Sequence, residues 1–366
     1  MKTVLSVFGT RPEAIKMCPL INELKSRDGI RSAVCVTGQH REILDGVLKA
    51  FGVIPDYDLA IMKDGQTLFD VTCHVLDRLC PVIDEVSPDV VLVHGDTTSA
   101  FAAALAAFYK RVDVAHVEAG LRTYNNADPY PEEFNRQAIG AIAKYHFAPT
   151  EWAKENLLSE NKNEKNVFVT GNTVIDALRT TVRKDYTHPE LEWARDSRLI
   201  IITAHRRENL GEPMERMLVA IRRVIEEADG VKAIFPIHPN PRLQRAAHSI
   251  LGECERIHLI EPVDTPDFHN LLARAHLVLS DSGGIQEEAT YLGIPLLVMR
   301  NKTERPEGLA SGALKLIGTD GEGVYQAFRL ALESCSTNSA PRTANLSYGD
   351  GSASKRIADI LTKALG

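Results

Sequence analysis

The stretch VLSVFGTRPEAIKMCPLINEL, residues 4–24, contains the change from strand to helix that decides the fold. An apolar run ends at Gly9, and the cations Arg11 and Lys16 follow as a helical pattern begins. Pro12 suits the first turn of a helix, because an N–H at that position has no partner in the helix. The stretch therefore predicts a buried strand, a turn at Gly9, and a helix that carries two cations in its first turns.

The same alternation of short apolar runs and amphipathic segments continues along the chain. Segments 66–86 and 213–228 are long enough to be crossover helices. Short strands that are apolar on both faces are typical of parallel sheets in α/β proteins. The expected strands are VLSVFG (4–9), SAVCVTG (32–38), VVLVHG (90–95), VDVAHVEAG (112–120), YHFAPT (145–150), NVFVTG (166–171), RLIIITA (198–204), KAIFPIH (232–238), RIHLIEP (256–262), LVLSDS (277–282) and IPLLVM (294–299).

The composition is that of a cytoplasmic protein with small-molecule partners. A length of 366 residues predicts two domains. A net charge of -7 without Lys/Arg stripes argues against binding to nucleic acid. No apolar stretch approaches the length of a membrane span, and the N-terminus does not resemble a signal peptide. The six cysteines form neither a CxxC pair nor a zinc-spaced set, which indicates reduced thiols.

A domain boundary is expected near 167–172, where NVFVTGN follows the charged stretch SENKNEKN. We place one Rossmann-like domain at 1–169 and a second, nucleotide-binding one at 170–352. Periodicity does not decide which of them the amphipathic tail helix, 353–366, packs on. Ligands of such sheets bind at the carboxyl ends of the strands, so two facing domains would form a site in the cleft between them.

The run SDSGGIQEEATYLG is the sharpest candidate for an anion site. Ser282 lies at an N-cap position after a strand, Gly283 and Gly284 allow close approach of a ligand, and a helix begins with free N–H groups. An ordinary capped glycine turn is the alternative. The anion would be a phosphate or diphosphate, and Glu288 could accept hydrogen bonds from a ribose diol.

Carboxylates form a second group. Asp96 in HGDTTS and Glu118 in HVEAGLR follow strands of the first half and should line the same cleft. Asp96 could instead cap the next helix, whereas capping does not call for a Glu at 118. Glu132 and Glu133 open a helix, where the dipole favours acids. A catalytic role requires that one of those two face the cleft.

Cations form the third group. Arg11 and His205 each follow an apolar strand, where a side chain points into a ligand crevice. His238 in PIHPNP is similar, although a His beside two prolines could simply order a loop. Most Lys and Arg side chains are solvated surface groups. The other candidates are Lys16, Arg136, Arg206, Arg207 and Arg305.

Several common motifs are absent from the sequence. It contains no strand followed by GxGxxG, no GxxxxGK[ST], no GxSxG and no metal-spaced histidine set. A diphosphate site, several carboxylates and several cations remain. In outline, these groups form a nucleotide-sugar site.

The motifs resemble, in order and spacing, those of the non-hydrolysing bacterial UDP-N-acetylglucosamine 2-epimerases. They are FGTRPEAIKM, VTGQHRE, LVHGDTTS, HVEAGLRT, PEEFNR, TGNTVIDAL, HRREN, SDSGGIQEEA and ERPEG. The resemblance implies a GT-B architecture, with two Rossmann-like domains around a cleft and the C-terminal helix returned to the first. It also implies a homodimer that interconverts UDP-GlcNAc and UDP-ManNAc without a metal or nicotinamide, and supplies ManNAc units for bacterial surface polysaccharide.

The resemblance implies a mechanism in which UDP is eliminated to give 2-acetamidoglucal and is then added back. It assigns catalysis to Asp96, Glu118 and Glu132, without deciding which is base and which is acid. The resemblance also places Arg11, Lys16 and Arg136 beside carboxylates and phosphates, and His238 at the substrate. His205 would contact the departing diphosphate or assist a proton transfer. The diphosphate and ribose would be held by Ser282, Gly283, Gly284, Glu288 and Arg305, and the uracil by Val263 and Phe268.

Many members of this family bind a second UDP-GlcNAc molecule as an activator. Gln39, His40 and Gln66 match residues used for it. Gly65 stands where some members have an Arg, so the sequence leaves activator binding open.

Three other functions remain to be weighed. A hydrolysing epimerase would release free ManNAc and UDP. A GT-B glycosyltransferase would need an acceptor groove, and the pair Asp96 and Glu118 at strand exits counts against it. A nucleotide-sugar sensor is disfavoured, because buried carboxylates are costly without a catalytic use.

Overall fold

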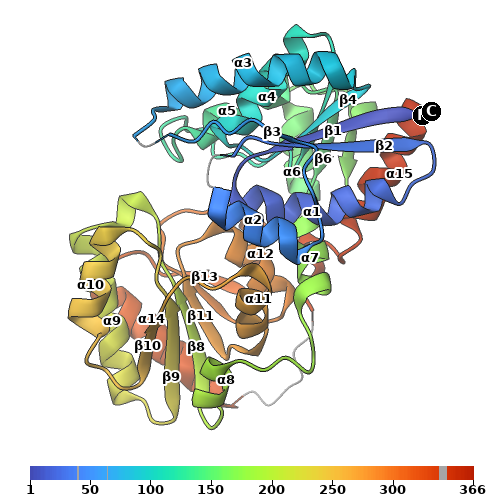
Figure 1. The fold of residues 1–366 in the computed structure, drawn as a ribbon. Helices are drawn as coiled ribbons and strands as arrows, with labels where there is room; N and C mark the ends of the chain where they lie inside the picture. Colours follow the sequence, from blue (N-terminus) through green and yellow to red (C-terminus); the bar gives the residue numbers. More distant parts are fainter. Residues whose placement is uncertain (39–40, 64, 338–343) are drawn as a thin grey trace. The chain divides into compact units, whose positions relative to one another are not determined.

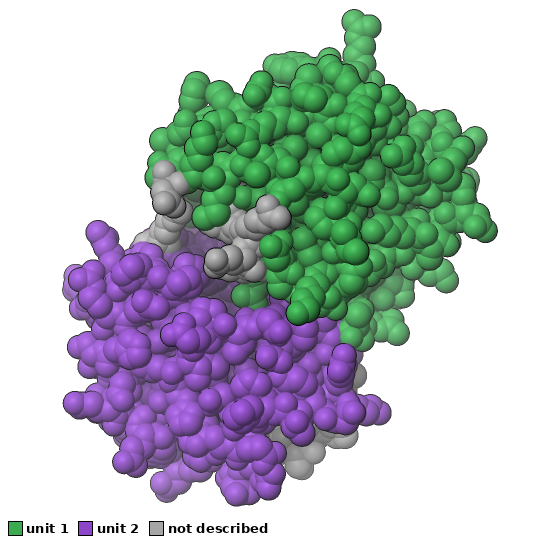
Figure 2. All heavy atoms as spheres, in the orientation of Figure 1, with its two compact units in different colours: residues 1–180, 348–366 green, residues 181–347 purple. Residues whose placement is uncertain are grey.

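The computed structural model describes residues 1–38, 41–63, 65–337 and 344–366. The chain forms two compact units, coloured separately in Figure 2. Unit 1 comprises Met1–Thr180 and Tyr348–Gly366, and unit 2 comprises Thr181–Ser347. Each unit contains one parallel sheet covered by helices on both faces (Figure 1).

The sheet of unit 1 has seven strands in the order β3-β2-β1-β4-β5-β6-β7. Side chains of β1 alternate between its two faces, because successive residues of a strand point in opposite directions. Val4 and Phe8 pack with α1, α2 and α15, while Leu5 and Val7 pack with α3 and α4. The strands are β1 (Lys2–Phe8), β2 (Ile30–Val36), β3 (Tyr57–Asp58), β4 (Val90–His94), β5 (Asp113–Val117), β6 (Tyr145–Ala148) and β7 (Val167–Val169).

The helices of unit 1 lie between these strands and at the C-terminus. They are α1 (Arg11–Lys25), α2 (Arg41–Ala50), α3 (Leu68–Val86), α4 (Thr98–Tyr109), α5 (Glu132–Ile142), α6 (Glu151–Ser159), the short η1 (Glu164–Asn166), α7 (Thr173–Thr181, whose last residue begins unit 2), η3 (Leu346–Tyr348, which ends in unit 1) and α15 (Ala353–Leu365).

The sheet of unit 2 has six strands in the order β10-β9-β8-β11-β12-β13. Helices α9, α10 and α14 cover one face, and α11 and α12 cover the other. The strands are β8 (Arg198–Thr203), β9 (Val231–Pro236), β10 (Ile257–Ile260), β11 (Leu277–Ser280), β12 (Leu296–Val298) and β13 (Leu314–Leu316). The helices are α8 (Pro189–Trp193), η2 (Arg207–Asn209), α9 (Glu212–Glu227), α10 (Pro241–Leu251), α11 (Thr265–Arg274), α12 (Gly283–Tyr291), α13 (Pro306–Ala310) and α14 (Gly321–Thr337).

The predicted α/β class with parallel sheets is confirmed. Every strand expected from the sequence corresponds to a strand of the structure. The sequence analysis missed β3 and β13, which are edge strands of two and three residues. Two residues carry no periodic pattern at β3, and Lys315 interrupts the apolar run at β13. Among the described residues, no helix combines the length and the apolar character needed to cross a membrane.

The division between the units differs from the boundary expected at 169/170. Helix α7 remains with unit 1, because the Asn172 N–H donates to the Tyr348 carbonyl at 2.7 Å. The N–H groups of Ala353 and Ser354 donate to the Asp176 carboxylate at 3.2 and 2.8 Å. These bonds tie the start of α7 to the segment that leads into α15, so unit 1 runs to Thr180 and resumes at Tyr348.

Candidate active site

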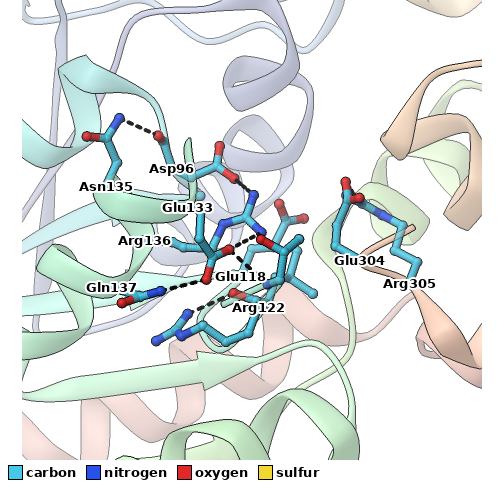
Figure 3. A network of polar contacts seen from close by, with 12 residues as sticks. Asp96, Glu118, Arg122, Glu133, Asn135, Arg136, Gln137, Glu304 and Arg305 are labelled. Carbon is cyan, nitrogen blue, oxygen red and sulfur yellow. Dashed lines mark hydrogen bonds and ion pairs between the residues drawn. The ribbon is translucent and has the colours of Figure 1, made fainter. Parts of the chain in front are cut away.

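Asp96 follows β4 in unit 1 and pairs with a cation from α5. Its carboxylate lies 2.5 Å from Arg136 Nη2, and its carbonyl accepts a hydrogen bond from Asn135 Nδ2 at 2.9 Å (Figure 3). Asp96 does not cap α4, since Thr97 is the N-cap and accepts from the Ala100 N–H. The capping alternative is therefore wrong for Asp96.

Glu133 holds Arg136 in place from the buried side of α5. It is fully buried and accepts hydrogen bonds from Thr123 N–H, Tyr124 N–H and Gln137 Nε2 at 2.9, 3.0 and 2.7 Å. Arg136 Nη1 lies 3.3 Å from the same carboxylate. Burial raises the pKa of Glu133, but these donors and the guanidinium outweigh it, so that its pKa lies below the usual value. Glu133 therefore has a structural role in holding Arg136. Glu132 begins α5 and is half-buried.

Glu118 follows β5 and pairs with Lys16 from the second turn of α1. Lys16 Nζ and Asn172 Nδ2 both donate to Glu118 Oε2, the latter at 2.7 Å. Both side chains of the ion pair are only 8% exposed. Glu118 has a φ of 63°, a left-handed conformation that is uncommon for residues other than glycine. Such strain persists where the surroundings fix it, and it clusters at functional sites.

His94, the last residue of β4, lies beside this pair. Its Nε2 is 3.8 Å from Glu118 Oε2, and the side chain is buried. Burial, with a contribution from the Lys16 charge, lowers the pKa of His94 to about 4 against the opposing effect of Glu118. His94 is therefore neutral near pH 7, and the positive charge beside Glu118 comes from Lys16.

The turn that carries Arg11 is fixed by a capping box. Thr10 caps α1, and the Glu13 carboxylate accepts from the N–H groups of Gly9 and Thr10 at 3.0 and 2.8 Å. Thr97 Oγ1 donates to the same carboxylate at 2.8 Å. Arg11 is the first residue of α1 and is half-buried. The sequence analysis passed over Glu13, although Thr-x-x-Glu before a helix is the usual signal of a capping box.

Asp281 organises the strand exits of unit 2. It follows β11, is fully buried, and accepts from the N–H groups of His205 and Arg206, both at 3.1 Å, and from Asn209 Nδ2 at 3.0 Å. Strands β8 and β11 are neighbours, and Thr203 pairs with Ser280 at their ends. The His205 ring remains 43% exposed, and its Nδ1 lies 3.5 Å from Asp281. Asp281 therefore holds a backbone loop that presents His205.

The N-terminus of α12 is a candidate anion site, because Ser282, Gly283 and Gly284 are partly exposed. Ser282 is its N-cap residue but makes no side-chain cap hydrogen bond. A Cβ atom added at Gly283 would lie 2.7 Å from Arg305 Nη1, whereas one at Gly284 would meet nothing closer than 4.0 Å. Glu288 is buried, and its Oε2 has no hydrogen-bond partner among the described residues. This arrangement combines helix N–H groups with a carboxylate suited to accept from a ligand.

Arg305 belongs to a buried ion network next to this helix. It donates to Glu287 Oε1 at 2.7 Å and to Glu304 Oε1 at 2.5 Å. Arg300 and Arg206 lie 3.1 and 3.7 Å from the Glu304 carboxylate. Burial raises the pKa of Glu304, but the three guanidinium groups outweigh it and hold that pKa far below its usual range.

Comparison with known proteins identifies the group to which this chain is related. The sequence model of the family described as UDP-N-acetylglucosamine 2-epimerase matches residues 22–362. The UDP-N-acetylglucosamine 2-epimerase of Bacillus subtilis (strain 168) is 55% identical over 358 residues, which cover 98% of this chain and 94% of that protein. The chain belongs to the UDP-N-acetylglucosamine 2-epimerase family.

Solved structures of the epimerase family are closely similar. A putative UDP-N-acetylglucosamine 2-epimerase from Listeria monocytogenes matches with a TM-score of 0.96 and 52% identity, covering 100% of this chain and 97% of that one. The Neisseria meningitidis UDP-GlcNAc 2-epimerase bound to UDP-GlcNAc matches with a TM-score of 0.93 and 45% identity, covering 99% of this chain and 100% of that one. The glycotransferase of kitacinnamycin, 12% identical with a TM-score of 0.67 over 100% and 99% of the chains, shares the fold alone. The predicted UDP-N-acetylglucosamine 2-epimerase family and the GT-B type fold are confirmed, and the non-hydrolysing reaction stays a prediction.

The remaining residues that the epimerase resemblance assigned to UDP lie on unit 2. His238 follows β9, is exposed, and stacks its ring on that of His205 with centroids 6.0 Å apart. Val263 directly precedes Asp264, the N-cap of α11, and Phe268 lies within α11. Both side chains are partly buried against the core. The structure thus brings His238 and His205 together at neighbouring strand exits.

Of the residues matched to an epimerase activator site, only Gln66 can be placed. It is half-buried, and its Oε1 accepts from the Lys63 N–H at 2.8 Å. Gln39 and His40 lie outside the described residues. Within the described parts of the chain, no group of three or more His, Cys, Asp and Glu side chains could hold a metal ion.

Sequence reasoning missed three residues that support the candidate epimerase site. Asn172 and Asp281 stand within quoted motifs, TGNTVIDAL and SDSGGIQEEA, but their partners, Glu118 and the loop that presents His205, are distant in sequence. His94 opens the quoted motif HGDTTS at the end of β4, but no role was predicted for it. For His94 and Asp281 the available signal was a polar residue at or directly after a strand end, whereas Asn172 lies three residues beyond the end of β7.

Proposed function

We propose that this protein interconverts UDP-GlcNAc and UDP-ManNAc by eliminating UDP and adding it back, without net hydrolysis. The observation that carries the proposal is two carboxylate–cation contacts in unit 1, the buried pair of Glu118 with Lys16 and the partly exposed pair of Asp96 with Arg136. A carboxylate held beside a cation can stabilise positive charge that develops in a sugar ring.

The chemistry explains why elimination is favoured over direct proton removal. The C2 proton of the sugar is not adjacent to a carbonyl, so a carboxylate with a pKa of about 4 faces a large barrier. If the bond from C1 to the diphosphate oxygen breaks, its electron pair leaves with UDP. A base then takes the C2 proton, and the C2–H electrons form the C1=C2 double bond of 2-acetamidoglucal. The reverse steps deliver a proton to the opposite face of C2 and restore the bond to UDP.

The residues divide these tasks between the units. Asp96, Glu118 and Glu132 would stabilise C1 and exchange the proton at C2. The open N-terminus of α12 would receive the diphosphate, because helix N–H groups and the helix dipole favour anions. His205, exposed beside Asp281, would donate to the departing phosphate. The partnerless Oε2 of Glu288 would accept from the ribose.

Two comparisons bear on the substrate and on the rival functions. The Neisseria relative was solved with UDP-GlcNAc bound, which supports this nucleotide sugar as the ligand here. A hydrolysing epimerase would use the same substrate and differ only in its products. The likeness to a glycotransferase concerns the fold and gives no support to glycosyl transfer.

Incubation with UDP-GlcNAc in D2O tests the proposal. ¹H NMR should show UDP-ManNAc with deuterium at C2, while chromatography shows no stoichiometric release of UDP. Asp96→Asn should abolish the exchange. Asp84→Asn, which changes a 61%-exposed carboxylate paired with Lys110, is the matched control and should retain it. Accumulation of free ManNAc and UDP would instead establish hydrolysis, and UDP-ManNAc without deuterium would exclude the elimination.

A further inference from the structure

Asn172 uses each of its polar groups in a different contact. Its N–H donates to the Tyr348 carbonyl at 2.7 Å, and its Oδ1 accepts from the Val174 N–H at 3.0 Å at the start of α7. Its Nδ2 donates to Glu118 Oε2 at 2.7 Å. The residue is only 2% exposed. Its amide therefore cannot rotate without breaking a buried hydrogen bond.

The Asn172 amide supplies a hydrogen-bond donor to Oε2 of the Glu118 carboxylate. A buried carboxylate requires hydrogen-bond donors, and an unsatisfied one is costly. Lys16 donates to the same Oε2 and contributes the charge. Asn172 adds a second donor without adding a charge. The two donors approach from α1 and from the residue before α7, so together they fix the position of Oε2.

The backbone of Asn172 is held by the C-terminal segment. Gly171 and Gly349 lie so close that a Cβ atom on Gly349 would be 2.9 Å from the Gly171 Cα. Asp176, one turn into α7, accepts from the N–H groups of Ala353 and Ser354 at the start of α15. Tyr348, whose carbonyl receives the Asn172 N–H, is itself buried. The returned C-terminus thus supports the position from which Asn172 reaches Glu118.

We propose that Asn172 is a positioning residue that orients Glu118 for catalysis, with its own backbone fixed by the C-terminal segment from Tyr348 onward. This inference rests on the proposed epimerisation, in which Glu118 acts at the sugar. Asn172 acts on the reaction only through the Glu118 carboxylate. Its loss should therefore affect turnover and leave the affinity for UDP intact.

Asn172→Asp is the most informative variant. It preserves the shape of the side chain and the Oδ1 acceptor for Val174, but replaces the donor with a carboxylate oxygen facing Glu118. Adjacent carboxylates disfavour each other's ionisation. We expect kcat to fall by roughly tenfold to a hundredfold, as loss of a hydrogen bond to a charged group allows. The acid limb of the kcat–pH profile should move to higher pH, with the Kd for UDP unchanged.

Asn22→Asp is the matched control, since the same substitution there removes the donor to the Phe51 carbonyl at 2.9 Å and leaves the Glu118 contacts unchanged. It should lower thermal stability while leaving the kcat–pH profile in place. If Asn172→Asp does not fold, Asn172→Ala carries the test and should lower kcat at constant Kd for UDP. A wild-type kcat and pH profile in the folded Asn172 variant, or the same pH shift in Asn22→Asp, would overturn the inference. Failure of the wild-type protein to form UDP-ManNAc would instead refute the proposed function.

Discussion

At the scale of single residues, unit 1 pairs buried cations with carboxylates at its candidate site. Lys16 and Glu118 are the clearest case, with both side chains 8% exposed. Removing one partner of such a pair leaves a charge in a poorly solvated place, which costs far more than the pair contributes. The arrangement suits a site that must keep a carboxylate ionised near a reacting sugar, and it makes stability and activity separable by mutation.

Lys16→Met should lower the free energy of unfolding by roughly 3–5 kcal/mol, because Glu118 then loses its counter-charge. The double variant Lys16→Met/Glu118→Gln should regain most of that stability and remain inactive. Urea denaturation with an epimerase assay measures both quantities. If the loss of unfolding free energy in the double variant equals the sum of the losses in the two single variants, the pair is not energetically coupled.

Strand exits indicated Asp96, Glu118 and His205 from the sequence alone, because parallel sheets expose the carboxyl ends of their strands. The supporting residues could not be predicted in this way. Asn172 meets Glu118, and Asp281 meets the His205 loop, only through the folded chain. For Asp96, the sequence could not separate a cap from a cleft carboxylate, since Thr97 can also cap α4.

At the scale of elements, three neighbouring strands of unit 1 each bury a histidine. His94 ends β4, while His116 in β5 pairs in register with His146 in β6. Burial lowers the pKa of His94 and His146 to about 4, and that of His116 to about 3. In the unfolded chain a histidine titrates near pH 6.5. Between these values the unfolded state binds protons that the folded state does not, so stability falls as pH falls.

Unit 1 should therefore be acid-sensitive. Each histidine can remove at most about 1.4 kcal/mol of stability per pH unit below about 6.5. The chain has two tryptophans, Trp152 in unit 1 and Trp193 in unit 2. Trp193→Phe leaves a reporter for unit 1, and Trp152→Phe leaves one for unit 2.

Urea unfolding of these two variants should show that unit 1 loses more free energy of unfolding than unit 2 between about pH 7.5 and 5.5. His146→Gln should reduce the loss in unit 1. Equal shifts of both reporters would contradict the assignment.

Element prediction succeeded where patterns were long. Helices α3 and α9 lie within two residues of the segments expected at 66–86 and 213–228. It failed for β3 and β13, whose pairing depends on a neighbouring strand more than on their own few residues.

At the scale of the whole molecule, the candidate groups are divided between two separately packed units. Unit 1 contains the candidate carboxylates with Lys16 and Arg136, and unit 2 contains the N-terminus of α12 with His205 and Glu288. The tail helix α15 belongs to unit 1 through contacts that sequence periodicity could not reveal, because many helix faces are apolar enough to receive it. Membership of the epimerase family explains why the groups of unit 1 and the groups of unit 2 occur in one chain.

The central claim is that the bond between C1 and UDP breaks and re-forms. UDP-GlcNAc labelled with ¹⁸O at the oxygen that bridges C1 and the β-phosphorus tests this most directly by ³¹P NMR. Released UDP can rotate its terminal phosphate, so we expect the label to spread from the bridging to the non-bridging oxygens as UDP-ManNAc forms. Conversion to UDP-ManNAc with the label still entirely in the bridge would contradict the account.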